Sequence, residues 1–538
     1  MNVAVIGSGP ASISCVSALI ERGVKITIID VGETLDSERK KLVESLASLP
    51  QEDWPKETLD IIKENPTIKD RVPKKFSFGS DFHYGLNHSY APITLYKSSA
   101  IPTFARGGYS TAWGATMLPI HDCDMQDWPF KRSELTPYFQ KVLANMPLCG
   151  GEDSLLNEFP LFKEKIGKLN HGQQAQSFFR DLEQAQSSLL QKNTLFGWSR
   201  LAVHTQGTDT QCISCGLCLS GCPRGSIYST VPTLQSYIQQ GLVSYKGGLL
   251  VEKIKETLGG TEVSLLDVKT LKRFSENYDA IFIGAGAINT TKILLASQEL
   301  FDKPIELKES QKFIVPFLRL RDSPMALDEK NVTLSSTFIE TKVPQISDHW
   351  IHLQISPINE WVLQSLGVDI NSHSLRQWVS APFLRRLMIA WGALHSDHSS
   401  KLVLTLKSQQ DKEEYNALVV ETIISSQAHK TAKKVTSSLF KLGFLFKSFF
   451  LYPLTRFSEG GTGTHCGASF PMSRYPSHEF SSDIFGRPFG WSHIFAIDAA
   501  VFPSIPGTTL ALTIMANAYR IGATAPLNPC YPTFFRMG

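Results

Sequence analysis

Residues 1–32 limit what this 538-residue chain can fold into more than any other stretch does. A short apolar run leads into a glycine-rich turn, an amphipathic segment follows, and a second apolar run stops at Asp30. Strand, tight turn, helix and strand, with an acid about twenty residues after the turn, form the βαβ fingerprint of dinucleotide binding. The alternative is an ordinary βαβ unit without a ligand.

Each part of the turn has a physical role in such a unit. Gly7 would permit the tight turn, and Gly9 would let backbone N–H groups approach a pyrophosphate, which the helix N-terminus favours electrostatically. Ser12 stands where a third glycine is usual and is small enough for close helix packing. Asp30 would accept a hydrogen bond from a ribose hydroxyl. The residues expected to form this part of the site are Gly7, Gly9, Pro10, Ala11, Ser12 and Asp30.

Length and composition indicate a folded protein of two or more domains. The chain is 42% hydrophobic and 19% charged, as globular proteins are, and its net charge of +3 is too small to indicate a nucleic-acid partner. It opens directly on a strand, without the segments of a secretory signal, and has no run of about eighteen apolar residues that could span a bilayer. We therefore expect a cytoplasmic protein.

The order of segments predicts an α/β chain (α+β overall): a Rossmann-like domain and a discontinuous second domain built on a mainly antiparallel sheet with helices. We expect residues 1–125, 205–312 and 459–538 to form the dinucleotide-binding domain, 126–204 a helical segment, and 313–458 a substrate domain. Helices are expected mainly in the following ranges: 33–75, 127–146, 160–192, 287–297, 418–450 and 509–521. A buried strand should end at a second glycine turn, which contains Gly284 and Gly286.

Four cysteines fall within eleven positions, in the order Cys212-x2-Cys215-x2-Cys218-x3-Cys222. This is the spacing of bacterial ferredoxin ligand runs, so it predicts an iron–sulfur cluster, 4Fe-4S or 3Fe-4S. The fourth cysteine of such a run serves a second cluster in two-cluster ferredoxins, and only one run exists here. Cys222 would therefore fold back, the site would hold three irons, or a distant thiol such as Cys149 would complete it. A structural zinc site and a metal-free loop are the alternatives.

Four blocks, in matching order, make the sequence resemble the glucose–methanol–choline (GMC) family of flavoprotein oxidoreductases. They are the N-terminal fingerprint, the segment GGYSTAWG at 107–114, the strand and turn at 279–295, and the C-terminal segments 463–472 and 495–522. The resemblance implies FAD as cofactor, with the 107–114 segment beside the flavin. It also implies an acid near the flavin phosphate and ribityl groups at Asp498, and a strand residue beside the adenine at Val251. The further residues expected to contact FAD are Gly107, Gly108, Ser110, Trp113, Gly114, Gly284, Gly286 and Thr508.

The resemblance also implies two catalytic positions. His465 matches the family's catalytic histidine, and imidazole suits proton transfer because its pKa lies near neutrality. The second position, normally His or Asn, falls on Thr509, whose hydroxyl can position a substrate but cannot take a proton at neutral pH. We therefore expect His465 to act alone as base and Thr509 to position the substrate, with Asn517 in reserve. A structural histidine in a turn is the alternative for His465.

Two apolar stretches with interspersed basic residues, 374–394 and 435–457, are expected to be buried helices. Their alternative is a surface that contacts lipid or admits a lipid-linked substrate. The motif His395-Ser-Asp397-His398 has metal-ligand spacing, but a solvent-exposed turn is the preferred interpretation.

The sequence thus predicts an FAD-dependent dehydrogenase that oxidises an alcohol, polyol or sugar C–OH to a carbonyl and passes electrons, through the cluster, to an external acceptor. One alternative is an oxidase that uses O2 without a functional cluster. Another is a flavin/iron–sulfur electron-transfer subunit without substrate chemistry of its own.

Overall fold

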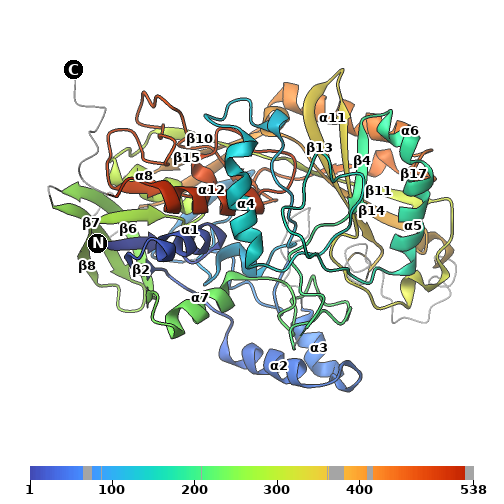
Figure 1. Ribbon diagram of the computed structural model, residues 1–538, viewed down its shortest axis with the longest axis horizontal. Helices are drawn as coiled ribbons and strands as arrows, with labels where there is room; N and C mark the ends of the chain where they lie inside the picture. The colour runs from blue at the N-terminus through green and yellow to red at the C-terminus, as the bar shows by residue number, and fades with distance from the viewer. Residues whose placement is uncertain are drawn as a thin grey trace.

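The computed structural model describes residues 1–64, 75–85, 88–207, 209–257, 259–359, 362, 381–408 and 416–527. A parallel sheet lies at one end of the molecule and a large antiparallel sheet at the other (Figure 1). The predicted fold class, a Rossmann-like domain with a second, mainly antiparallel domain, is confirmed.

The parallel sheet draws its strands from the start, the middle and the end of the chain. In sheet order they are β20 (Ile494–Ala496), β9 (Ala280–Ile283), β1 (Asn2–Ile6), β2 (Lys25–Ile29) and β5 (Ser244–Lys246). β9 and β20 are fully buried and β1 and β2 nearly so, as parallel strands covered on both faces should be. The order places the glycine turns that follow β1 and β9 side by side.

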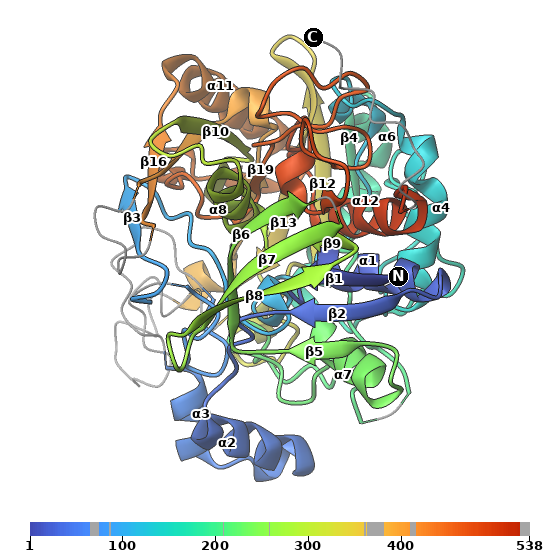
Figure 2. The same ribbon diagram turned by 90° about the vertical axis from the view of Figure 1, so that its left-hand side faces the viewer.

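Two helices far apart in sequence pack together against this sheet: α1 (Pro10–Glu21) and α12 (Ala511–Thr524). Their close approach depends on Gly522, because a Cβ atom there would lie 2.8 Å from the Cys15 carbonyl oxygen. α7 (Thr230–Gln239) and α8 (Ala287–Ser297) complete the helices of this end. A three-stranded antiparallel sheet lies next to it (Figure 2): β6 (Leu249–Thr257), β7 (Gly260–Asp267) and β8 (Arg273–Tyr278).

The large sheet has the strand order β17-β11-β14-β13-β12-β4, with β18 beside β11. The strands are β17 (Ser448–Phe450), β11 (Lys312–Arg319), β14 (Leu387–Ala393), β13 (Ser347–Pro357), β12 (Thr337–Val343), β4 (Thr194–Trp198) and β18 (Arg456–Phe457). Its aromatic core, centred on Phe178, Phe317 and Phe446, is closed by α5 (Gln173–Gln184) and α11 (Ser426–Leu442).

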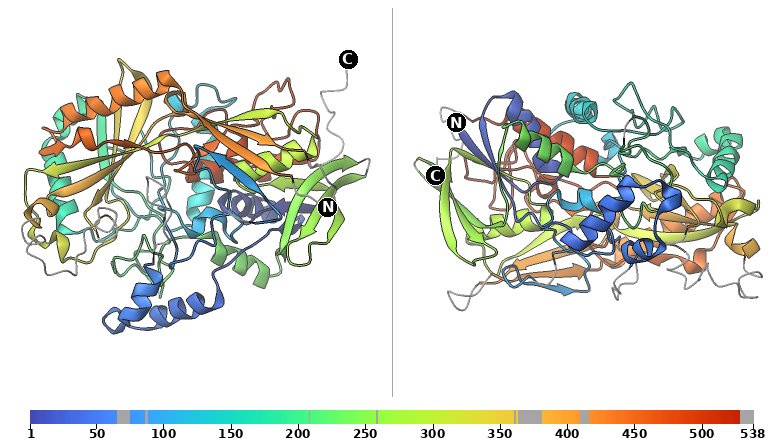
Figure 3. Two further views of the ribbon diagram at one scale, coloured as in Figure 1. Left: turned by 180° about the vertical axis from the view of Figure 1, so that it is seen from behind. Right: turned by 90° about the horizontal axis from the view of Figure 1, so that it is seen from below.

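A second five-stranded sheet lies between the two ends. Its order is β19 (Cys466–Gly467), β10 (Pro304–Glu309), β15 (Lys401–Leu406), β16 (Leu418–Ile423) and β3 (Ile93–Tyr96). Figure 3 shows β3, in blue, beside the orange strands β15 and β16. Because β10 and β15 pair across residue 312, and β4 pairs with β12, strand pairing crosses the expected domain limits. The domain division stays a prediction.

The remaining helices are α2 (Ser37–Ser48), α3 (Lys56–Ile62), α4 (Arg132–Ala144) and α6 (Gln186–Leu190). α2 and α3 confirm that the described part of 33–75 is mainly helical. Both helices protrude from the body of the molecule (Figure 1). Among the described residues, no helix is long and apolar enough to cross a bilayer.

Three secondary-structure expectations were wrong. Residues 418–423 form β16 rather than a helix, since alternate side chains face the core and the backbone pairs with β15. Residues 448–450, in the same predicted helix and in the 435–457 stretch, form β17. Residues 160–172, the first part of the helix predicted for 160–192, are not helical; the helix begins at Gln173, the first residue of α5. In the stretch 374–394, residues 374–380 lie outside the described part, and 387–393 are β14, between two strands of the large sheet. A short apolar run is compatible with either a buried strand or a helix.

Candidate active site

One long cavity gathers residues from all four motif blocks. Its empty volume, counted out to the open mouth, is about 1840 Å³. Of the residues predicted to contact FAD, those that line it are Gly7, Gly9, Pro10, Ala11, Asp30, Gly108, Ser110, Trp113, Val251, Gly284, Gly286 and Asp498.

The glycine turn after β1 is shaped for close backbone approach. Gly7 has φ +89°, and a Cβ atom there would lie 2.8 Å from the Gly284 carbonyl oxygen, so a side chain would clash. Gly9 precedes α1, whose N-terminus opens toward the cavity and would favour an anionic group. Ser12 does not line the cavity: its hydroxyl donates to the carbonyls of Ile6 and Gly284, 3.1 Å away in both cases, and ties the two glycine turns together.

Asp30 lines the cavity but already has protein partners. Its carboxyl accepts a short hydrogen bond from the Ser8 hydroxyl and a longer one, 3.3 Å, from the Tyr245 hydroxyl. Ser8 in turn accepts the Gly107 N–H at 2.8 Å, so Gly107 supports Asp30 rather than lining the cavity. Burial raises the pKa of Asp30 to about 7, and these hydrogen bonds oppose the rise.

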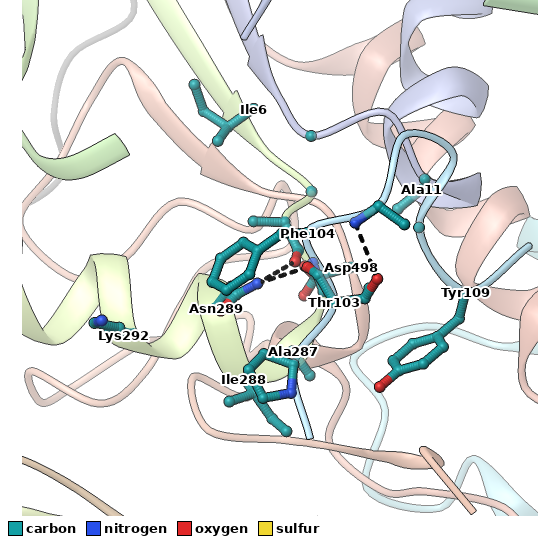
Figure 4. A pocket seen from close by; sticks show the side chains of 18 of the residues that line it. Ile6, Ala11, Thr103, Phe104, Tyr109, Ala287, Ile288, Asn289, Lys292 and Asp498 are labelled. Atoms are coloured by element: carbon teal, nitrogen blue, oxygen red, sulfur yellow. Dashed lines mark hydrogen bonds between the residues drawn. The ribbon is translucent and has the colours of Figure 1, made fainter. Parts of the chain in front are cut away.

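Asp498 connects β20 to the turn after β9. Its carboxylate accepts hydrogen bonds from the Gly286 N–H (2.9 Å), the Thr290 hydroxyl (2.5 Å) and the Ala500 N–H (2.9 Å). Burial nevertheless raises its pKa to about 6. Figure 4 shows this side chain among the cavity residues. The acid expected at this position is therefore held at the cavity wall by fixed donors.

Two polar cavity residues on α8 were not predicted. Asn289 donates its amide to the Thr103 carbonyl at 3.0 Å, and Lys292 lies farther along the same helix (Figure 4). Burial lowers the pKa of Lys292 to about 8. The spacing of these residues after the second glycine turn could have predicted their position. Ala285, Asn289 and Lys292 are four and three residues apart, as residues on one face of a helix are.

His465 lies in the wall of the same cavity, and its role as a catalytic base stays a prediction. Its Nδ1 is 2.9 Å from the Nζ of Lys312, the first residue of β11. Burial first, then the Lys312 and His352 charges, hold the pKa of His465 well below its ordinary value, so the ring is neutral at neutral pH. Burial lowers the pKa of Lys312 to about 7, opposed by Glu309. Burial raises the pKa of Glu309 to about 7.

Several other predicted residues do not line the cavity. The Thr509 hydroxyl accepts the Leu118 N–H at 2.6 Å and donates to the Leu118 carbonyl at 3.2 Å, so both its hydrogen-bonding roles are used within the protein. Thr508 is fully buried and its hydroxyl has no partner. Gly114 is exposed to solvent. Asn517 is fully buried and binds Arg520.

The four cysteines of the run surround a second, small cavity. Cys212, Cys215, Cys218 and Cys222 line it together with apolar side chains, and all four are free thiols. Cys149 does not line it; its thiol donates to the Leu201 carbonyl at 3.3 Å. Within the described residues, no three of these sulfurs lie within 4.8 Å of one another.

Lys75 connects the two cavities. Its ammonium donates to the Trp113 carbonyl at 3.0 Å, and Trp113 lines the large cavity. Burial lowers the pKa of Lys75 to about 8, while Cys218 and Cys222 raise it, which places the amine beside the cysteine run.

Comparison with known proteins identifies the fold. No family model and no curated protein match the sequence. Among solved structures, pyridoxine 4-oxidase from Mesorbium loti superposes with a TM-score of 0.60 at 12% sequence identity, over 97% of this chain and 98% of the other. The chain therefore has the fold of that oxidase along nearly its whole length.

Proposed function

We propose that this protein is an FAD-dependent oxidoreductase that oxidises the C–OH group of an alcohol, polyol or sugar to a carbonyl. One observation carries the proposal: a single cavity contains both glycine turns of the dinucleotide type and, in its wall, a buried neutral imidazole. The clash that any side chain at Gly7 would cause with the Gly284 carbonyl shows that the two glycine turns pack directly against each other. Bound FAD would supply the two-electron oxidant that accepts the hydride.

His465 is the proposed base for the substrate O–H, and Lys312 decides which ring nitrogen is free. Because Nδ1 faces Lys312, Nε2 is the nitrogen left for substrate. An ammonium at Lys312 donates to Nδ1, so the neutral ring carries its proton on Nε2 and cannot act as base. A neutral amine at Lys312 can instead accept a hydrogen bond from Nδ1–H. The ring then carries its proton on Nδ1, and the Nε2 lone pair is free. Lys312 is thus a positioning residue.

The hydrogen bonds of Thr509 do not support the substrate-positioning role that the resemblance implies. Its hydroxyl is engaged with Leu118, so we propose that it holds Leu118 against the residues just before α12. Substrate positioning by Thr509 stays a prediction.

For the electrons we propose an iron–sulfur cluster bound by the four cysteines of the run, leading to an external acceptor. Support comes from four free thiols around one pocket and from Lys75, which lies between this pocket and the flavin-side Trp113. A structural zinc ion held by the same four thiols stays the alternative.

Anaerobic mixing with a panel of alcohols, polyols and sugars, pyridoxine included, tests the activity. Rapid loss of the flavin absorption band with at least one of them is expected, with the matching carbonyl as product. Lack of bleaching by every alcohol would favour the electron-transfer subunit. Because pyridoxine 4-oxidase is by name an oxidase, aerobic assays should measure hydrogen peroxide; stoichiometric peroxide would favour an oxidase over the proposed dehydrogenase.

Lipid contact is proposed for one surface, and a cytoplasmic location stays a prediction. The C-terminal part of α11 and the residues after it bury Val435, Leu439 and Phe446 but leave Phe440, Phe444 and other large apolar side chains in solvent. We call the exposed ones, together with Leu320, which follows β11 and donates its N–H to the Lys447 carbonyl, the α11 patch: Leu320, Phe440, Phe444, Phe449 and Leu454.

A further inference from the structure

A cluster of metal-ligating side chains lies outside the flavin cavity and outside the cysteine run. It consists of Asp124, His349 and His395, each of which offers one ligand atom within 4.8 Å of the other two. They come from separate elements: the 3₁₀ turn Asp122–Asp124, strand β13, and the turn that follows β14. None of the three lines the flavin cavity.

Two atoms of this cluster are buried without a hydrogen-bond partner. They are Asp124 Oδ2 and His395 Nε2, on side chains of residues that are 1% and 2% exposed. The solvent-exposed turn expected for His395 is therefore wrong. Buried polar atoms are nearly always paired, so two neighbouring ones without partners point to a ligand that both can bind.

The two imidazoles lie side by side, and each turns one nitrogen to Asp397. The His349 and His395 rings stack, with centroids 3.5 Å apart and planes 9° apart. His349 Nε2 lies 3.1 Å from Asp397 Oδ2, and His395 Nδ1 accepts the Asp397 backbone N–H at 3.2 Å. The other nitrogen of each ring, His349 Nδ1 and His395 Nε2, faces Asp124. His349 Nδ1 lies 2.8 Å from Asp124 Oδ1.

Metal-bound histidines commonly turn their second nitrogen to a carboxylate, and Asp397 stands in that place for His349. The neutral His395 ring, whose Nδ1 accepts an N–H, carries its proton on Nε2. Binding of an ion at Nε2 would move that proton to Nδ1, 3.5 Å from the Asp397 carboxylate.

We propose that Asp124, His349 and His395 form a binding site for one divalent transition-metal ion of the zinc class. The donors are His349 Nδ1, His395 Nε2 and the Asp124 carboxylate, which leave one position of a tetrahedral shell for water. Imidazole with carboxylate suits zinc better than it suits magnesium or calcium, which prefer oxygen alone. The competing arrangement is an imidazolium at His349 held between Asp124 and Asp397, and the ion would replace its proton.

The position of the site gives the ion a structural task. The Asp124 carbonyl accepts the Ser504 hydroxyl at 2.8 Å, and the Ser396 N–H donates to the Ile505 carbonyl at 2.9 Å. Both partners lie in the loop that leads to Leu510, a flavin-cavity residue. An ion at this point would fasten the large sheet to that loop. This inference does not depend on the proposed activity.

The test uses the full-length protein with all four cysteines of the run replaced by serine, so that the run offers no thiolate to zinc. After chelator treatment, the protein is titrated with Zn²⁺ and examined by calorimetry and zinc X-ray absorption. One ion per chain is expected, with nitrogen and oxygen neighbours at about 2.0–2.2 Å and none at the about 2.3 Å of sulfur. The melting temperature should rise with Zn²⁺ and fall again with chelator.

His395→Gln should weaken this binding at least tenfold and abolish the melting shift. His398→Gln is the matched control, because His398 Nε2 binds the Ser347 hydroxyl at 2.6 Å and belongs to the same turn. Absence of a nitrogen- and oxygen-bound ion in the cysteine-blocked parent would overturn the proposal in favour of the imidazolium, whether or not His395→Gln folds. Equal zinc affinity in His395→Gln and His398→Gln would overturn it as well.

Discussion

A single imidazole carries the proposed proton transfer, so His465 and Thr509 should respond differently to truncation. General bases contribute about 10²–10⁴-fold to a rate, and we expect His465→Ala to lower kcat by that order with FAD retained. Thr509→Ala removes two hydrogen bonds to Leu118 rather than a substrate contact, so it should lower the melting temperature more than kcat. Stopped-flow flavin reduction and thermal melts check this; an equal loss of kcat in both variants would contradict it.

The protonation of the Lys312 amine should determine how kcat/KM falls at low pH. Its pKa is lowered to about 7, and only the neutral amine leaves the Nε2 lone pair of His465 free. Thus kcat/KM should rise with pH through about 7, and fall about tenfold per pH unit below that value, because one proton is involved.

Lys312→Met removes this titration, so its profile should be flat where the parent's profile rises. Lys308→Met is the matched control, since Lys308 donates to the Pro503 carbonyl and does not contact His465. An unchanged acid limb in Lys312→Met would show that another group controls the base.

At the scale of elements, the contact between α1 and α12 depends on one missing side chain. A Cβ at Gly522 would lie 2.8 Å from the Cys15 carbonyl, and backbone cannot move aside as a side chain can. Gly522→Ala should therefore destabilise the protein by about 1–3 kcal/mol, the usual cost of overpacking. Gly259→Ala is the control, because its Cβ would meet open space. Urea denaturation measures both; equal stability of Gly522→Ala and the parent would show that the helices can separate at no cost.

Elements with a local signal could be predicted from sequence, and those defined by distant pairing could not. The turn at Gly7 and Gly9 has its own steric requirement, which a short motif records. β16 has no such mark, because its sequence, LVVETI, does not alternate strictly between apolar and polar residues. A short apolar run of this kind looks the same as a helical fragment until the partner strand β15 is known.

The same limit applies to the site. His465 could be predicted from its neighbours in sequence, but its partner Lys312 lies more than one hundred and fifty positions away. It reaches the imidazole because β11 starts beside the chain that leads into β19. Burial of His395 likewise follows from packing against the 503–509 segment, which no local pattern encodes.

For the whole molecule, the cysteine pocket and the flavin cavity should behave as separable parts of one electron path. Cys215→Ser is expected to lower bound iron and acid-labile sulfide while alcohol still bleaches the flavin, because Cys215 lines only the small cavity. Turnover with an external one-electron acceptor should fall more than flavin reduction does. Cys123→Ser, outside the run, is the control. Iron-free parent protein after anaerobic purification would contradict the cluster.

The α11 patch, finally, should bring the molecule to anionic bilayers. Phe444 is 87% and Phe449 60% exposed, and no Asp or Glu occurs between Glu421 and Glu459, a stretch that contains exposed lysines of α11. Apolar side chains beside cations are the pattern of interfacial binding.

Phe444→Ser with Phe449→Ser should weaken co-sedimentation with phosphatidylglycerol-containing vesicles by at least tenfold, because burying one Phe is worth about 1.5–3 kcal/mol. Tyr475→Ser is the matched control, since Tyr475 is 84% exposed outside the patch. Binding should also fall at high salt and with pure phosphatidylcholine, where the charge attraction is lost. Equal sedimentation of the parent and the double variant with anionic vesicles would show that the patch does not contact lipid. Analytical ultracentrifugation would then test whether the exposed aromatic rings mediate self-association instead.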